Sequence, residues 1–117
     1  MFTTRPEIRG TFGVVASTHW LGSAAGMRAL ERGGNAFDAA VTCGFTLQVV
    51  EPHLNGPGGD LPALFYSTKM GKLQALCAQG PSPAAMTMEA VRALGLDLIP
   101  GSGFLPAVVP GAFDGWL

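Results

Sequence analysis

Residues 33–60, GGNAFDAAVTCGFTLQVVEPHLNGPGGD, carry the strongest indications of how this chain folds. The glycine pair 33–34 predicts a helix end, because glycine adopts a left-handed backbone conformation without steric cost. Asn35 is a good cap for the next helix, and Asp38 puts a negative charge in its first turn. Residues 36–50 are apolar on all sides, which predicts a helix that is buried on most of its faces.

A glycine-rich turn follows this helix. Pro52 ends the helix, and residues 55–60 contain three glycines and a proline, which neither a helix nor a central strand tolerates. A phosphate-binding loop would need Lys and Ser or Thr at the start of a helix, whereas Asp60 and a predicted strand follow here. We therefore interpret residues 55–60 as a structural turn.

Helices and strands alternate along the rest of the chain. Ser17 and Thr18 are good caps for a helix over about 19–32, and small residues on one face of that helix predict close packing against another backbone. The other expected elements are strands at 12–16, 63–67, 73–78 and 107–109, a helix at 88–94 capped by Thr87, and the start of a helix at 114. This order predicts an α/β (α+β) layered fold, with 1–117 as one unit and no internal boundary.

The composition is unusual for a small independent domain. Charged residues make up 13% of the chain, against about 25% in ordinary soluble domains. Apolar residues make up 48%, and there are 17 glycines. One interpretation is a weakly charged, Gly/Ala-rich small domain. The composition favours the other, an internal part of a larger protein whose faces are covered by other segments.

Charge and cysteine patterns exclude several classes of function. The net charge is −1 and no basic stripe exists, so we expect neither nucleic-acid nor membrane-surface binding. Residues 1–7 do not resemble a secretory signal, and residues 36–50 are too short and too polar to span a bilayer. Cys43 and Cys77 are isolated, which favours free thiols over a disulfide. We therefore expect a cytoplasmic location.

The chain alone carries no credible catalytic set. His19 and His53 lack partners at metal-ligand spacing, so we expect no metal and no cofactor. Asp38 and Asp60 are explained by helix and turn formation, and no GxSxG motif is present. We therefore predict no catalytic residue within these 117 residues.

Several ordered motifs match one known family. They are GVVASTH at 13–19, GGNAFDAA at 33–40, VVEPH at 49–53, GPGG at 56–59 and VPGA at 109–112. The chain thereby resembles the N-terminal part of the large subunit of the γ-glutamyltransferase (γ-glutamyltranspeptidase) family of N-terminal-nucleophile hydrolases. The resemblance covers almost the whole chain.

The resemblance implies a four-layer αββα fold in the complete protein. It also implies autocatalytic processing that exposes an N-terminal threonine nucleophile, located outside this chain. The expected partners are the remaining large-subunit segments, the small subunit that bears the threonine, and a small amide substrate. Residues 1–117 would then be an N-terminal fragment, inactive as an amidase by itself.

One departure from the family bears on the substrate. Family transferases have an arginine at the end of the returning strand, in a pattern like AREVAP, which binds the α-carboxylate of the glutamyl group. Gln79 occupies that position here, in AQGPSP at 78–83. Other relatives carry an arginine where this chain has Pro81. A neutral amide cannot form the charged bidentate pair that an arginine forms with a carboxylate.

The departure implies an amidohydrolase or acylase, with Gln79 binding the substrate. The resemblance further implies that the glycine turn supports the active-site cleft through Asn55, Gly56, Gly58 and Gly59. One alternative is a genuine γ-glutamyltransferase acting on glutathione-like γ-glutamyl amides. An alternative from another class is a non-catalytic binding or structural module.

Overall fold

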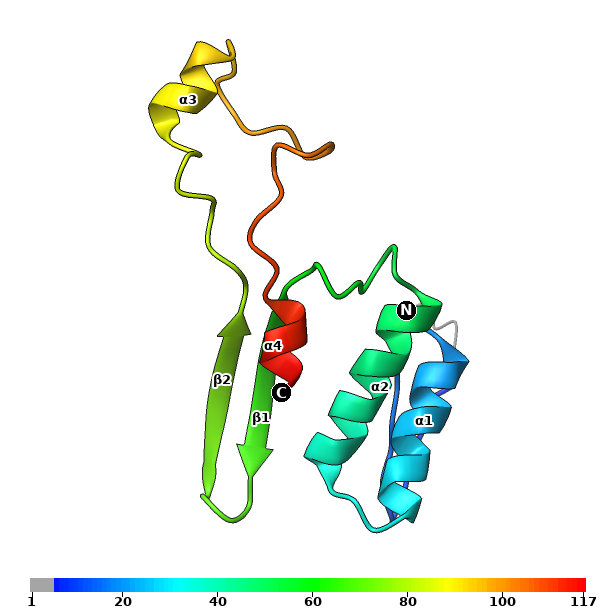
Figure 1. The fold of residues 1–117 in the computed structure, drawn as a ribbon. Helices are drawn as coiled ribbons and strands as arrows, with labels where there is room; N and C mark the ends of the chain where they lie inside the picture. Colours follow the sequence, from blue (N-terminus) through cyan, green and yellow to red (C-terminus); the bar gives the residue numbers. More distant parts are fainter. Residues whose placement is uncertain (1–5) are drawn as a thin grey trace. The chain divides into compact units, whose positions relative to one another are not determined.

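The computed structural model describes residues 6–117. The chain divides into a first compact unit that ends at Gly56 and a second that begins at Pro57. Each unit has its own secondary structure (Figure 1). The absence of an internal domain boundary stays a prediction.

Two helices that lie side by side form the body of the first unit, α1 (Trp20–Glu31) and α2 (Ala36–Val50) (Figure 1). Glycines on α1 allow this approach. A Cβ atom added at Gly22 would lie 2.8 Å from a methyl carbon of Leu47, and one added at Gly26 would lie 3.0 Å from the Ala39 carbonyl oxygen. The predicted close packing of the small face of α1 is thus confirmed.

The connection between the two helices forms as the glycine pair and the asparagine predict. Gly33 has a φ of 91°, in the left-handed region that favours glycine. The Asn35 side chain accepts hydrogen bonds from the backbone N–H groups of Phe37 (2.7 Å) and Asp38 (3.2 Å). The Asp38 carboxylate accepts in return from the Asn35 N–H at 2.7 Å, which completes a capping box.

The predicted cap of α1 is wrong by one or two residues. His19 is the N-cap, because its Nδ1 accepts from the Leu21 N–H at 3.2 Å. The two hydroxyl groups expected to cap the helix have other partners. Ser17 donates to the His19 carbonyl at 2.7 Å, and Thr18 donates to the Glu51 carboxylate.

Two further expectations for the first unit are wrong. Residues 12–16 form no strand, because no neighbouring strand within residues 6–117 pairs with them. Val15 instead packs against Gly26 of α1. Helix α2 is buried along one stripe only, at Ala39, Cys43, Gly44 and Gln48, since α1 is the helix that covers it. On another side of α2, Val49 is 80% exposed.

The second unit is built on the predicted hairpin. Strands β1 (Leu61–Ser67) and β2 (Lys72–Ala78) pair antiparallel, with Leu61 opposite Ala78 and Ser67 opposite Lys72. Gly71, with a φ of 64°, closes the loop between the strands. The short helix α4 (Ala112–Trp116) packs against both strands (Figure 1).

Helix α3 (Met88–Ala93) is capped by Thr87, as predicted. The Thr87 side chain accepts from the Ala90 N–H at 3.2 Å. The strand expected at 107–109 is absent from this part of the chain, because one backbone hydrogen bond, from Val109 N–H to the Pro81 carbonyl at 3.0 Å, does not make a ladder.

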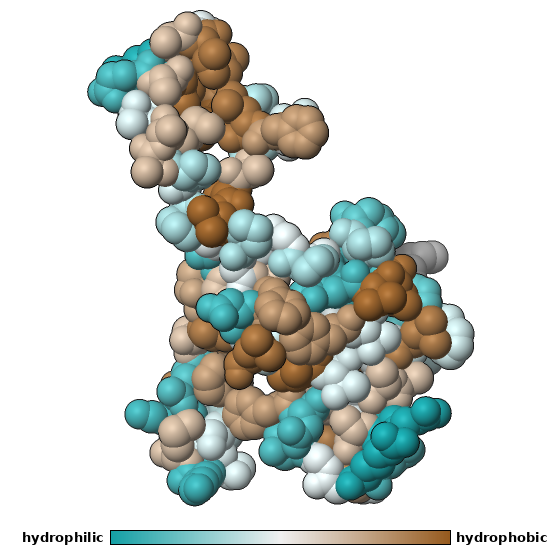
Figure 2. Space-filling view, viewed as in Figure 1, coloured by the Kyte–Doolittle hydropathy of each residue, from teal (hydrophilic) through white to brown (hydrophobic). Residues whose placement is uncertain are grey.

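Large apolar side chains reach the surface on both units, and Figure 2 shows them as brown areas. Leu64 on β1 is 74% exposed. None of the helices within residues 6–117 is long and apolar enough to cross a bilayer. The cytoplasmic location stays a prediction. The mixture of helices and a sheet agrees with the α+β class that the sequence predicts.

Candidate functional site

Gln79 lies directly after β2, on a groove within the second unit. The groove has a volume of about 380 Å³. It is formed by the end of β2, the residues after it, and the segment that leads into α4. Its lining residues are Leu76, Cys77, Ala78, Gln79, Gly80, Pro81, Pro110, Gly111, Asp114 and Gly115. Gln79 is exposed, so its amide can reach a molecule in the groove.

Glycines allow the two walls of this groove to approach each other. A Cβ atom added at Gly80 would overlap the carbonyl oxygen of Val109. One added at Gly111 would overlap the Ala78 carbonyl oxygen, and one at Gly115 would overlap the Ala78 side chain. Any larger residue at these positions would therefore push the walls apart.

The predicted glycine turn holds one wall through a single residue. The Gly59 carbonyl accepts hydrogen bonds from the N–H groups of Gly111 at 3.1 Å and Ala112 at 2.9 Å. The other turn residues expected to support a cleft, Asn55, Gly56 and Gly58, contribute nothing to the lining of the groove. A Cβ atom at Gly58 would meet no atom within 4 Å. Support of an active-site cleft by this turn stays a prediction.

Asp114 is a groove residue that the sequence interpretation missed. Of the described residues that line the groove, it is the one that carries a charge. Within residues 6–117 the ion pair is between Arg9 and Glu7, so the Asp114 carboxylate has no ion-pair partner there. Position 114 was assigned only to the start of a helix. Its place two residues after the VPGA motif is the signal that could have drawn attention to it.

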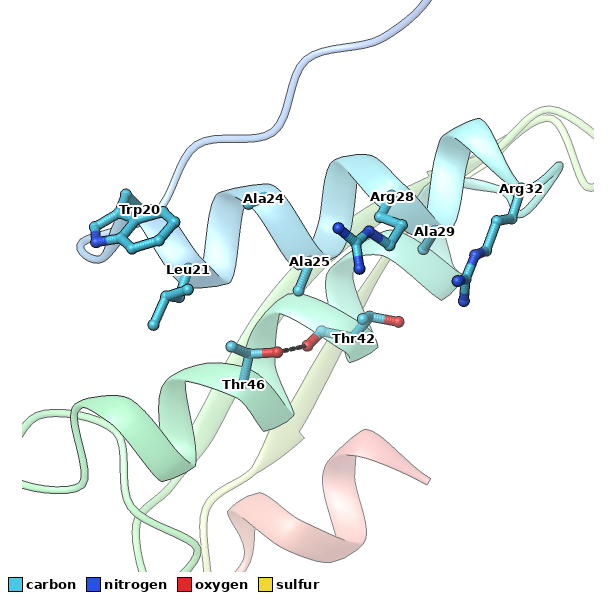
Figure 3. A pocket seen from close by; sticks show the side chains of 9 residues that line it. All are labelled: Trp20, Leu21, Ala24, Ala25, Arg28, Ala29, Arg32, Thr42 and Thr46. Atoms are coloured by element: carbon cyan, nitrogen blue, oxygen red, sulfur yellow. Dashed lines mark hydrogen bonds between the residues drawn. The ribbon is translucent and has the colours of Figure 1, made fainter.

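A second groove, of about 520 Å³, lies between α1 and α2 (Figure 3). Figure 3 shows Arg28 and Arg32 extending from α1, across from Thr42 and Thr46 of α2. The Thr46 hydroxyl donates to the Thr42 carbonyl at 2.7 Å. None of the predicted site residues lies here. The arginines are near the C-terminus of α1, where positive charge opposes the helix dipole.

Neither groove contains a nucleophile paired with a base. Nδ1 of His19 is occupied by the cap of α1. Among residues 6–117, no group of three His, Cys, Asp or Glu side chains is placed to hold a metal ion. Among the residues that line the first groove, the Gln79 amide can donate and accept hydrogen bonds and the Asp114 carboxylate can accept them.

The sequence model of γ-glutamyltranspeptidase matches residues 22–117. The chain belongs to the γ-glutamyltranspeptidase family. It is 40% identical to the glutathione hydrolase-like YwrD proenzyme of Bacillus subtilis over 111 residues, which are 94% of this chain and 21% of that protein.

Solved structures of this family agree in fold with the chain. The structure of LmbA2991T421A is 58% identical, with a TM-score of 0.86, over 99% of this chain and 20% of that one. Cephalosporin acylase from Bacillus halodurans is 38% identical, with a TM-score of 0.77, over 98% of this chain and 22% of that one. The chain thus spans about a fifth of the length of these relatives. The predicted family is confirmed, and the matched relatives include hydrolase and acylase proenzymes as well as transpeptidases.

Proposed function

We propose that this chain is the N-terminal part of an amidohydrolase or acylase that cleaves an amide through a self-exposed N-terminal threonine outside residues 1–117. The complete enzyme would have the four-layer αββα fold. Its other large-subunit segments and its small subunit would be the partners of this chain. Relatives named as hydrolase and acylase proenzymes support this proposal.

The proposed chemistry needs one nucleophile and one base, both supplied by the same threonine. Its hydroxyl attacks the amide carbonyl and passes its proton to the free α-amino group of the residue. The amine leaves with that proton, and an ester to the enzyme remains. Water then hydrolyses the ester, which releases the acid and restores the threonine. The part of residues 1–117 in this scheme is to recognise the acyl group.

The identity of residue 79 is the observation that supports the proposed substrate class. Among the residues that the structure describes, 6–117, no basic residue lines the groove at Gln79. A carboxylate on the substrate would therefore find an amide and a like charge there, but no guanidinium. This environment favours acyl groups without an α-carboxylate over γ-glutamyl groups.

Substitution of Gln79 tests the proposal in the processed full-length enzyme. The measurement is the ratio of kcat/KM for γ-glutamyl over 4-aminobutanoyl p-nitroanilide, which has the same ammonium group but lacks the α-carboxylate. Gln79→Arg should raise this ratio, because a charge-assisted pair contributes roughly 1.5–3 kcal/mol, or about 10- to 150-fold at most. Gln79→Lys supplies charge without the planar fork and should raise the ratio less.

Three results would argue against the proposal. A strong preference of the wild-type enzyme for γ-glutamyl amides would favour the alternative, a genuine γ-glutamyltransferase. A ratio unchanged by both variants would mean that residue 79 does not contact the acyl group. A protein that hydrolyses neither anilide after processing would favour a non-catalytic module.

A further inference from the structure

We infer that the groove at Gln79 receives a positively charged part of the substrate, and that Asp114 selects it. This inference rests on the proposed function and narrows its substrate class to acyl groups that bear an ammonium or a similar cation. The groove combines one carboxylate, which has no ion-pair partner within residues 6–117, with one neutral amide and otherwise small or apolar residues.

The charge of the lining decides which group is accepted. With Asp114 as its one charged lining residue, the groove attracts a cation, accepts a neutral group and repels a carboxylate. The Gln79 carbonyl oxygen can accept a second hydrogen bond from an ammonium group, which has three N–H donors. An arginine at position 79 would instead pair with Asp114 or with an anionic substrate.

Asp114 is held in place before any ligand binds. Helix α4 is anchored by Ala112, which is 0% exposed and donates its N–H to the Gly59 carbonyl at 2.9 Å. The Gly115 N–H donates to the Gly111 carbonyl at 3.0 Å, and a side chain at Gly115 would overlap Ala78 of β2. A carboxylate on a fixed helix binds a cation with a small loss of conformational entropy.

A purely structural role for Asp114 makes a different prediction. Asp114 lies in the first turn of α4, where a negative charge favours the helix. If that were its only role, its replacement would change activity on all substrates by the same factor. A role in the groove changes activity according to the charge of the substrate.

The test uses three p-nitroanilides of similar length in the processed full-length enzyme. They are 6-aminohexanoyl (cationic), heptanoyl (neutral) and adipoyl (anionic) p-nitroanilide. Because Asp114 is exposed, we use the range of exposed ion pairs, about 1.4- to 5-fold in kcat/KM for each step from cation to neutral and from neutral to anion. The cation-to-anion preference is then about 2- to 25-fold, and it should fall between 50 mM and 500 mM NaCl.

Asp114→Asn should abolish this preference, so that the kcat/KM values for the three anilides converge. Asp97→Asn is the matched control, since it removes the same charge from an exposed residue of the second unit that does not line the groove. An unchanged preference in Asp114→Asn, an equal loss on all three substrates, or the same effect in Asp97→Asn would each overturn the inference.

Binding separates this inference from the proposed function. If the processed protein hydrolyses none of the anilides, the proposed function fails. In that case, calorimetric titration with 6-aminohexanamide, heptanamide and adipamic acid still measures how tightly the groove binds each charge type. Tighter binding of the cationic amide that Asp114→Asn removes supports the charge selection, whereas equal affinities for the three amides refute it.

Discussion

Gly80→Ala tests how the groove is built. A Cβ atom at this position would overlap the Val109 carbonyl oxygen. Such overpacking costs about 1–3 kcal/mol, because one of the two segments must move. Movement of the segment would also break the hydrogen bond from Val109 N–H to the Pro81 carbonyl at 3.0 Å, which contributes about 0.5–1.5 kcal/mol. The sum is a loss of about 1.5–4.5 kcal/mol in the free energy of unfolding.

Urea unfolding followed by the fluorescence of Trp116 measures this loss in the second unit. A Trp20→Phe background removes the other tryptophan, which lies exposed on α1. With a slope of about 2 kcal/mol per molar urea, Gly80→Ala should lower the midpoint by about 1–2 M.

Gly58→Ala is the matched control for this experiment. A Cβ atom there meets nothing within 4 Å and the φ of Gly58 is not positive, so the change should be neutral or stabilise by about 0.4–1 kcal/mol. Equal midpoints for Gly80→Ala and Gly58→Ala would refute the close approach of the two walls.

Three further predictions concern helix caps and activity. Asn35→Ala removes two hydrogen bonds of the capping box, so it should lower the stability of the first unit by about 1–2 kcal/mol, measured by thermal unfolding. Asn35→Asp should keep most of that stability, because aspartate is also a good N-cap. Hydrogen bonds from the Glu89 N–H and the Thr87 hydroxyl lower the pKa of Glu89. These hydrogen bonds therefore stabilise the folded state at pH values above the ordinary glutamate pKa, and this stabilisation is lost as the pH falls through the lowered pKa. Thr87→Ala should raise the Glu89 pKa, and a carboxyl-carbon NMR titration that shows no rise would contradict this. The isolated 117-residue chain should release no p-nitroaniline from γ-glutamyl or simple acyl anilides, and release that persists after removal of contaminating enzymes would disprove it.

Local sequence predicts the elements whose causes are local. Helix α2 has the predicted bounds, because Asn35 and Asp38 form a reciprocal cap within four residues and Pro52 stops the helix. The hairpin was predicted for the same reason, since Gly71 supplies the one left-handed residue that its loop needs. These interactions join residues that are close along the chain, so the pattern alone contains the information.

The sequence interpretation failed where a distant partner decides the structure. Residues 12–16 and 107–109 are apolar and β-branched, but a strand forms only beside another strand, and no strand within residues 6–117 pairs with them. His19 caps α1 in place of the predicted hydroxyl residues, because the Thr18 hydroxyl donates a hydrogen bond to the Glu51 carboxylate, 33 residues away. Propensity gives no information about such partners.

The groove was predictable only in part, for the same reason. The resemblance to the family pointed to Gln79, but the facing wall lies about 30 residues further along the chain. From the sequence, Gly80 and Gly111 were interpreted as loop residues, and Gly115 as part of the start of a helix. In the structure, each is required because a backbone or side-chain atom occupies the place of its missing Cβ.

The residues that set the shape of the groove differ from those that set its charge. The walls are held by backbone hydrogen bonds and glycine contacts, which do not depend on the side chains at positions 79 and 114. Those two exposed side chains can therefore change the charge of the groove without changing its fold. Under the proposed function, a family with hydrolases, acylases and transpeptidases on one fold uses such positions, because a new acyl group then requires new side chains at the rim of the groove but no new core.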